Sequence, residues 1–358
     1  MHIPDGYLSP STCAVLYAGA APFWYVALTR VRRLLHTRVV PLISLFAAFS
    51  FVAMMFNIPL PGGTTGHAVG VGISAVVLGP WASMLAISVA LIIQAFFFGD
   101  GGVTAIGANC FNMAVAGSLV AWAVYRLVGA GSPLTATRRV VAAGVAGYAA
   151  INVAALLTAI EFGIQPLLFL DASGAPLYSP YPLDIAVPAM MIGHITVAGM
   201  AELVMTAGVV AFLQRTDPSL LAASAGVSSS AAGSPRTLRA LWVSVGMLMV
   251  LAPLGLLAAG TAWGEWAASD FSDPETRQEI AAASLNQAPP AQAPKGLERL
   301  SSFWTAPWPD YAPGFVRSES FGYILSAVFG VGLVILASAA IGRALGAGIR
   351  PPLDKAGA

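Results

Sequence analysis

Long apolar runs separated by short polar connections make up most of the 358-residue chain. Apolar stretches of roughly 17 to 25 residues are long enough to cross a bilayer as single helices. The runs that meet this criterion lie near residues 9–29, 40–57, 82–98, 103–128, 138–160, 186–214, 241–262 and 320–342. The pattern therefore predicts an all-α membrane protein.

The apolar run 66–98 is too long for one ordinary span, and Gly79-Pro80 interrupts it. We interpret residues 68–79 as a short, irregular half-helix that crosses separately from the span at 82–98. Irregular backbone at membrane depth is tolerated only where protein or a cavity covers it. The half-helix should therefore lie beside a site, and the total is about nine transmembrane helices.

The basic residues predict the orientation of these helices. No Lys or Arg precedes Arg30, so the first run lacks the charge of a secretory signal and is expected to be a retained span behind an intact N-terminus. Cytoplasmic connections carry an excess of Lys and Arg, which places the N-terminus outside and the C-terminus inside. With nine crossings, one side holds 13 of the 17 basic residues: Arg30, Arg32, Arg33, Arg38, Arg126, Arg138, Arg139, Arg215, Arg236, Arg239, Arg343, Arg350 and Lys355.

The composition changes once along the chain. Residues 217–238 are rich in Ala, Ser and Gly, which is typical of a linker. They separate residues 1–216, with seven spans, from residues 239–345, in which two spans enclose a polar loop at about 263–318. We expect a seven-helix bundle followed by a two-helix hairpin, with the linker and the tail 346–358 in the cytoplasm and the loop on the extracytoplasmic side.

Composition and missing motifs exclude several functions. Hydrophobic residues make up 57% of the chain and charged residues 9%, whereas soluble domains carry roughly 25% charge. A net charge of +1 without a basic cluster argues against nucleic-acid binding. The only lysines, Lys295 and Lys355, are not followed by Ser or Thr, so the sequence has no P-loop for ATP. Hydrolase and zinc-protease motifs are also missing, and we do not expect an enzyme.

The second residue of the chain, His2, offers a chelate for a metal ion. The terminal amine of Met1, the amide nitrogen of His2 and its imidazole Nδ1 can bind one ion in fused rings. A fourth nitrogen from His67, on the same predicted side, would complete a plane that suits Ni(II) or Cu(II), and also Co(II). The alternative is an exposed His2 and a His67 that only begins a helix. The turn-forming residues 4–6 favour a terminus that folds back into the protein.

Four further polar residues lie within apolar runs, where unpaired polar groups are costly. Asn109 and Asn112, three positions apart, are expected on one helix face, either as partners of a metal site or as bonds between helices. His194 and Glu202 are ionisable residues of a predicted span and therefore functional candidates. Their eight-residue spacing places them within about 80° of each other around a helix. They form either a proton or ion relay, a structural pair, or a contact to a partner helix.

Four separated segments resemble, in family order, the membrane substrate-binding component (CbiM/NikM type) of energy-coupling-factor transporters for cobalt and nickel. They are MHIPDGYLSP, PGGTTGHAVG, LGPWASMLAISVALIIQAFFFGDGGVTAIGANCFNMAVAG and HITVAGMAELVMTAGVVAFLQR. The resemblance covers roughly residues 1–215. The later part is similar to the two-span auxiliary component of the same systems. Its Pro-Asp-Gly-Leu-Glu motif appears here at residues 294–298, with Lys295 in place of Asp.

The resemblance implies a metal site made by the Met1 amine, the His2 amide and imidazole, and His67, with Asn109 and Asn112 close to it. The bound Co(II) or Ni(II) is the transported ion, and no permanently bound cofactor is implied. The implied partners are a transmembrane coupling protein and two cytoplasmic ATPase subunits, in the inner (plasma) membrane of a prokaryote. Such a protein captures the ion on the extracytoplasmic face for ATP-driven uptake.

Two other functions remain open from the sequence. The first is an ATP-independent secondary transporter that exchanges metal and protons through Glu202 and His194. The second is a membrane anchor or sensor whose late loop binds a partner, which would give His2 and His67 no role. The sequence does not choose between nickel and cobalt, because both fit nitrogen ligands.

Overall fold

The computed structural model describes residues 1–32, 39–222 and 234–346. Most of these residues are helical, as predicted. The middle of the predicted linker, residues 223–233, and the predicted tail from residue 347 onward lie outside the described residues. Within the described part, seven helical stretches are long and apolar enough to cross a membrane: Pro10–Arg32, Val71–Phe98, Ile106–Val128, Thr137–Leu168, Leu183–Thr216, Pro235–Leu257 and Glu319–Gly346.

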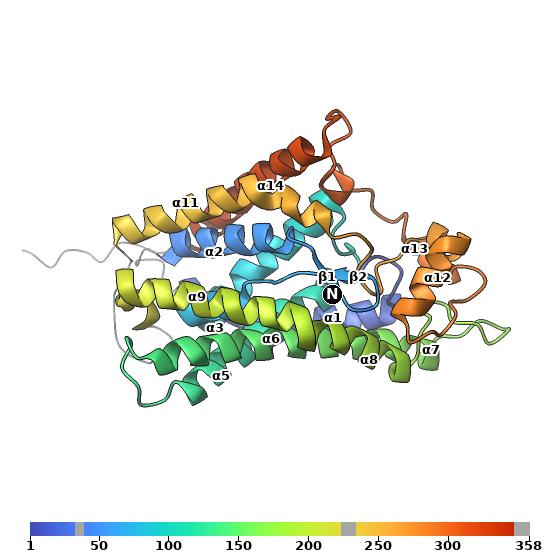
Figure 1. Cartoon of the computed structure of the whole chain (residues 1–358), viewed down its shortest axis with the longest axis horizontal. Helices are drawn as coiled ribbons and strands as arrows, with labels where there is room; N and C mark the ends of the chain where they lie inside the picture. Colours follow the sequence, from blue (N-terminus) through green and yellow to red (C-terminus); the bar gives the residue numbers. More distant parts are fainter. Residues whose placement is uncertain (33–38, 223–233, 347–358) are drawn as a thin grey trace, which may run out of the picture.

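A bundle of parallel and antiparallel helices forms the body of the molecule (Figure 1). α3 is its most buried helix and packs against α2, α5 and α6. The number of membrane crossings and their orientation stay predictions. The bounds in the first part of the chain are α1 (Pro10–Arg32), α2 (Val39–Met54), α3 (Val71–Ile93), α4 (Ile106–Asn109), α5 (Gly117–Val128), α6 (Thr137–Gly163), α7 (Gln165–Leu168), α8 (Leu183–Gly193) and α9 (Gly199–Thr216).

The helical run that begins with α3 reverses its direction at Gly79. This residue has φ 74° and ψ 170°, a conformation that only glycine adopts without strain. The side chain of Val71 lies against Gly117, while Ser118 Oγ donates to Ser83 Oγ over 2.9 Å. A straight helix would separate Val71 from Ser83 by about 18 Å. The residues before Gly79 therefore form a short helix beside the longer one, as the predicted half-helix at 68–79 requires.

The expectation of an all-α protein is wrong at one place. Strands β1 (Ile58–Leu60) and β2 (Thr64–Gly66) pair antiparallel, with Pro59 opposite Thr65. The turn between them contains Gly62 and Gly63 with φ 90° and 81°. The proline and glycine residues of this connection prevent a helix from continuing here and favour a tight reversal. The hairpin ends directly before His67.

Three π-helical segments interrupt the bundle helices: Gln94–Phe98, Cys110–Ala116 and His194–Ala198. They follow α3, α4 and α8 without a break in the helix. Each residue of a π-helix turns the chain by a smaller angle than in an α-helix, because its hydrogen bonds join residues i and i+5. Predictions of shared helix faces made with the α-helical period therefore fail across these segments.

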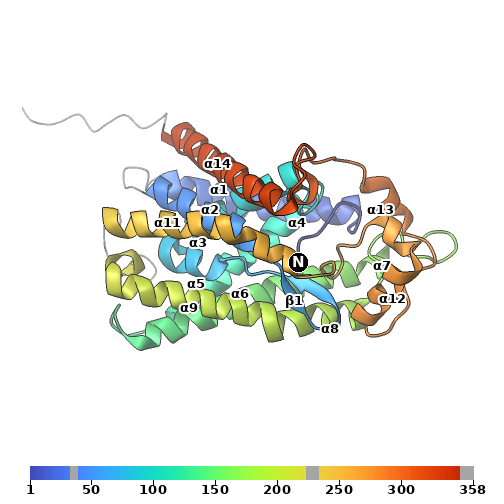
Figure 2. The same cartoon turned by 45° about the horizontal axis from the view of Figure 1, so that its top comes forward.

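The second part of the chain adds α11 (Pro235–Leu251) and α14 (Glu319–Gly346), which pack on α2. α11 begins earlier than the predicted span 241–262, because Ser234 caps it by accepting a hydrogen bond from Thr237 N. The polar loop between them is ordered and contains α12 (Pro274–Ala283) and α13 (Lys295–Leu300). It covers the end of the bundle where α7 and α8 lie (Figures 1 and 2).

Basic residues gather at the opposite end of the bundle. The starts of α6 and α11 and the ends of α5 and α9 lie there, away from α12 and α13 (Figure 1). Arg126 and Arg215 stand in the last turns of α5 and α9, and Arg138 in the first turn of α6. The two ends of the molecule therefore differ in charge as the predicted orientation requires.

Candidate metal site at the N-terminus

The N-terminal segment folds back into the bundle, and its first three residues are buried. Asn109, at the end of α4, fixes this segment through two hydrogen bonds to the backbone of Ile3. Its Oδ1 accepts from Ile3 N over 2.8 Å, and its Nδ2 donates to Ile3 O over 3.1 Å. Asp5 then accepts a hydrogen bond from Thr104 N over 2.7 Å, which fixes the following turn. The terminus is a docked element of the fold and not a free end.

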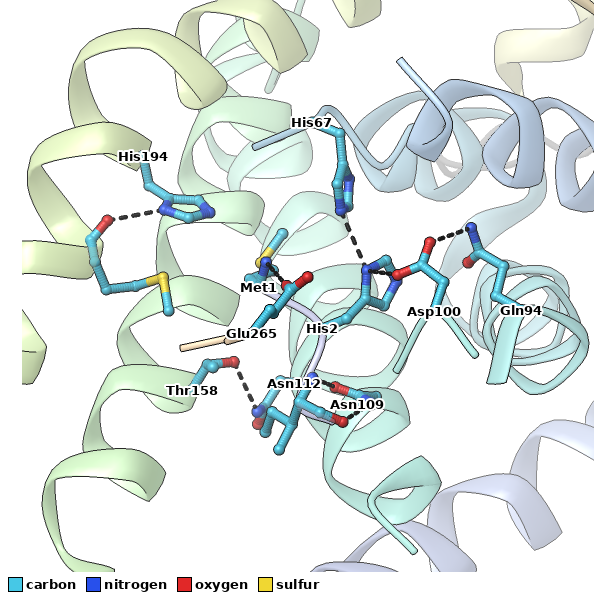
Figure 3. A network of polar contacts seen from close by, with 12 residues as sticks. Met1, His2, His67, Gln94, Asp100, Asn109, Asn112, Thr158, His194 and Glu265 are labelled. Atoms are coloured by element: carbon cyan, nitrogen blue, oxygen red, sulfur yellow. Dashed lines mark hydrogen bonds and ion pairs between the residues drawn. The ribbon is translucent and has the colours of Figure 1, made fainter. Parts of the chain in front are cut away.

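This docking brings two imidazole nitrogens together inside the protein. His2 Nδ1 lies 3.2 Å from His67 Nε2, and both side chains are buried (Figure 3). Metal–nitrogen bonds of about 2.0 Å at right angles place neighbouring donor atoms about 2.8 Å apart. The two nitrogens therefore need a shift of only tenths of an ångström to bind one ion side by side. The terminal amine of Met1 lies near them (Figure 3).

Side chains alone do not form a metal site here. Within the described ranges, no group of three or more His, Cys, Asp or Glu side chains is placed to hold a metal ion. The predicted metal ligands are not all side-chain atoms. Two of the four nitrogens, the Met1 amine and the His2 amide, belong to the main chain. Only His2 and His67 contribute side chains to this set of ligands.

Two carboxylates contact the nitrogen donors. Asp100 Oδ1 lies 2.8 Å from His2 Nδ1, and Glu265 Oε1 accepts from the Met1 amine over 3.2 Å. Asp100 follows the π-helix after α3, whereas Glu265 comes from the loop of the second part. Both parts of the chain therefore contribute contacts to the terminal donors.

Asp100 is held by two further polar side chains. Tyr311 OH donates to Asp100 Oδ2 over 2.5 Å, and Gln94 Nε2 donates to Tyr311 OH over 2.9 Å. Burial opposes ionisation of Asp100, but His2 and Tyr311 outweigh it and hold the pKa of the carboxyl below its usual range. Tyr311 also lies in the loop of the second part. This part of the site therefore carries a negative charge next to His2.

The surroundings of His67 keep its ring neutral. Burial, followed by the charges of His2 and of the N-terminus, lowers the pKa of His67 well below its ordinary value. His67 Nδ1 lies 3.2 Å from the carbonyl oxygen of Ala68, which leaves Nε2 facing His2. A neutral imidazole with a free nitrogen is the form that binds a metal.

The other predicted residues lie outside this contact network. Asn112 does not share partners with Asn109, because the π-helix Cys110–Ala116 separates their directions. Its Nδ2 donates to Thr158 Oγ1 over 3.1 Å (Figure 3). It also donates to Glu161 Oε2 over 2.8 Å, and both bonds join this helix to α6. Asn112 therefore links two helices through its hydrogen bonds, which is the second of the two predicted roles.

His194 and Glu202 do not form a pair. His194 Nδ1 bonds to the carbonyl oxygen of Met190 over 2.8 Å, and Glu202 is bound to the backbone at the start of α3. The π-helix His194–Ala198 lies between them and changes the angle that an α-helix would give. The contacts of these two residues do not support a direct proton relay, whereas the contact of Glu202 with the start of α3 is the predicted contact to a partner helix.

Sequence reasoning missed Gln94, Asp100, Glu265 and Tyr311. Gln94 and Asp100 could have been found from the sequence, because both are polar residues at the end of the apolar run that leads to residue 100. Glu265 and Tyr311 could not have been found in this way, because their contacts with Met1 and Asp100 join positions more than 200 residues apart.

The Pro-Lys-Gly-Leu-Glu segment fastens the late loop to the first part. Lys295 Nζ lies 2.7 Å from Asp171 Oδ2 on the surface, and Gly296 N donates to Leu177 O over 2.7 Å. A side chain on Gly296 would collide with the same carbonyl oxygen. The Lys that replaces Asp in this motif therefore has an acidic partner in the first part of the chain.

Comparison with known proteins places both parts of the chain in families. Residues 2–220 match the model of the cobalt uptake substrate-specific transmembrane region (CbiM), and residues 238–347 match the PDGLE domain. The fused nickel transport protein NikMN of Rhodobacter capsulatus is 57% identical over 357 residues, which covers 100% of both chains. The cobalt transport protein CbiM of Geobacter sulfurreducens is 35% identical and covers 81% of this chain and 80% of its own.

The fold of the first part is also known from crystallography. The structure of a truncated transition metal transporter is 49% identical, with a TM-score of 0.56, and covers 60% of this chain and 99% of its own. These similarities and the seven apolar helices indicate a multi-pass membrane protein of nickel and cobalt transport.

Proposed function

Because the chain belongs to the cobalt uptake substrate-specific transmembrane family, with a PDGLE domain fused behind it, we propose that it is the substrate-binding component of an energy-coupling-factor importer. It captures Ni(II) or Co(II) on the extracytoplasmic face. A transmembrane coupling protein and two ATPase subunits supply the energy, since the chain itself has no P-loop. The proposed membrane is the inner membrane of a prokaryote.

The approach of His2 Nδ1 to within 3.2 Å of His67 Nε2 carries this proposal. The ion binds to these two nitrogens, to the Met1 amine and to the His2 amide. On binding, the Met1 ammonium and the His2 amide each release a proton to solvent, and the proton of the His2 ring resides on Nε2. His2 Nδ1 then exchanges Asp100 for the ion, and the Met1 amine exchanges Glu265. Four nitrogen donors in one plane suit Ni(II). The 57% identity to a protein named as a fused nickel transport protein also supports nickel as the ion of this chain.

Each of the two regions that match a family has its own proposed role. Residues 1–216 form the metal-binding component, residues 217–238 the linker and residues 239–345 the auxiliary component, whose loop at 263–318 covers the site from outside. The predicted orientation, with nine spans, the N-terminus outside and the tail in the cytoplasm, belongs to this proposal. It is supported by the basic end of the bundle lying opposite the late loop (Figure 1).

A titration of the purified full-length protein with Ni(II) and Co(II) tests the proposal. We compare the native N-terminus with a form that carries Gly-Ser before Met1, and with His67→Ala. Both changes remove or displace a donor, so tight binding of one equivalent should be lost. His194→Gln is the matched control, because His194 is a buried histidine that bonds to Met190 O and to none of the four donors. Equal binding by the native and the extended form would refute the site.

The secondary transporter is the remaining alternative. It predicts metal uptake in proteoliposomes that contain this chain alone and respond to a pH gradient. Uptake that needs the coupling protein, the ATPases and ATP would exclude it.

A further inference from the structure

Glu202 carries a carboxyl group in an unusual place for a membrane protein. It stands in α9, and its side chain has 0% exposure. Among the ion pairs of the described residues, none involves Glu202. A buried carboxylate without a cation is costly unless several hydrogen bonds satisfy its oxygens.

The carboxylate of Glu202 accepts three backbone hydrogen bonds at the start of α3. Oε2 accepts from Val69 N over 2.8 Å and from Gly70 N over 2.9 Å, and Oε1 accepts from Gly72 N over 3.0 Å. The first N–H groups of a helix have no acceptor within that helix. The positive end of the helix dipole also favours an anion at this place. Glu202, a residue of α9, therefore caps the N-terminus of α3.

The capped segment is the one that carries His67. Only Ala68 separates His67 from the first residue that Glu202 holds. The same segment is fixed from α2, because Ser50 Oγ donates to Val69 O over 2.6 Å. Gly72 packs against Gly147 so closely that a side chain there would collide with the backbone. The position of the His67 backbone thus depends on contacts with α2, α6 and α9.

We propose that Glu202 is a positioning residue for the metal site, which it serves by holding the backbone that carries His67 close to His2. This inference rests on the proposed function. It differs from the relay expected of Glu202 in a secondary transporter, since the side chain acts through the backbone of residues 69–72 and not by transferring a proton.

The test replaces one acceptor oxygen and leaves the volume unchanged. Glu202→Gln presents an NH₂ group to the backbone N–H groups, so that at least one of the three hydrogen bonds is lost. We expect the protein to fold and the Ni(II) affinity to fall about tenfold or more. The visible absorption band of bound Ni(II) should shift as well, because the fourth nitrogen is displaced. A purely structural role would lower the melting temperature and leave that band unchanged.

Ser118→Ala is the matched control. It removes a buried hydrogen bond between α5 and the longer helix of α3, from Ser118 to Ser83, without touching residues 67–72. Its melting temperature should fall while the Ni(II) affinity and spectrum stay native. Native affinity and spectrum in Glu202→Gln would overturn the inference. If that variant does not fold, Glu202→Asp takes its place, since the shorter side chain cannot reach all three N–H groups. Native binding in Glu202→Asp overturns the inference equally.

The outcome for the native protein separates the two proposals. If the native protein does not bind Ni(II), the proposed function fails before Glu202 is tested. If it binds Ni(II) and both Glu202 variants match it, only the positioning role fails.

Discussion

The hydrogen bonds of Asn109 make a quantitative prediction for the variant Asn109→Ala. The amide of Asn109 bonds to both Ile3 N and Ile3 O, and Ile3 has 0% exposure. Ile3 O keeps a second donor, Gly102 N at 2.8 Å. In the variant, Ile3 O therefore keeps one of its two hydrogen bonds. The buried N–H of Ile3 loses its hydrogen bond to Asn109.

The two losses differ in size. An unsatisfied buried N–H costs about 1–3 kcal/mol, and the loss of one ordinary hydrogen bond costs about 0.5–1.5 kcal/mol. Together they destabilise the docked terminus by about 2–4 kcal/mol. The Met1 amine and the His2 nitrogens reach His67 only when the terminus is docked. Because about 1.4 kcal/mol corresponds to a factor of ten, the Ni(II) affinity of Asn109→Ala should fall by about 30-fold to several hundredfold.

The assay is competition for Ni(II) with a chelator of known affinity, on full-length protein with its native N-terminus. Asn112→Ala is the control, because Asn112 is also a buried amide but bonds to Thr158 and Glu161. It should lose thermal stability and keep its Ni(II) affinity. The reasoning is refuted if Asn109→Ala binds Ni(II) as the native protein does, or if both variants lose affinity to the same extent.

Three further variants test other parts of the structure. Gly296→Ala should expose the late loop to limited proteolysis, because its Cβ would lie 2.3 Å from Leu177 O; an unchanged cleavage rate would contradict the docking of that loop. Gly79→Ala should lower the free energy of unfolding by about 1–3 kcal/mol, the cost of a side chain in this backbone conformation, with native Ni(II) affinity; an altered affinity would show that the reversal is coupled to the site. Lys295→Ala should leave both the melting temperature and Ni(II) binding unchanged, since its ion pair with Asp171 is exposed to solvent.

Coordination chemistry leads to the hypothesis that His2 and His67 bind one ion together, because the position of His2 in the chain limits what its nitrogens can do. The structure brings the two ring nitrogens to within 3.2 Å, and metal binding stays a prediction. The break at Gly79-Pro80 is equally predictable, since proline and glycine act on the local backbone. The break depends on neighbouring residues, whereas His2 and His67 lie 65 positions apart. The hydrophobic pattern likewise locates most of the long helices within a few residues. The largest deviation is α11, which begins six residues before the predicted span 241–262 because of its Ser-Pro cap and ends at Leu251, eleven residues before that span does.

Predictions that depend on an ideal helical period are less successful. The α-helical period places Asn109 and Asn112 on one face, and His194 and Glu202 within reach of each other. A π-helix lies within each of these intervals, and nothing in an apolar run marks its position. The polar contacts of Glu265 and Tyr311 are beyond sequence reasoning for another reason, since they depend on how the late loop folds over the bundle.

The contacts of that loop explain why the second part of the chain must follow the whole length of the bundle. The first part ends with α9 at the basic end, whereas the loop that supplies Glu265 and Tyr311 to Met1 and Asp100 covers the other end (Figure 1). α11 carries the chain from the first end to the second, and α14 returns it. α14 packs so closely on α2 that a side chain at Gly330 would collide with the ring of Phe51. The two helices therefore set the depth at which the loop meets the N-terminus, and the covalent fusion keeps the loop present at every binding event.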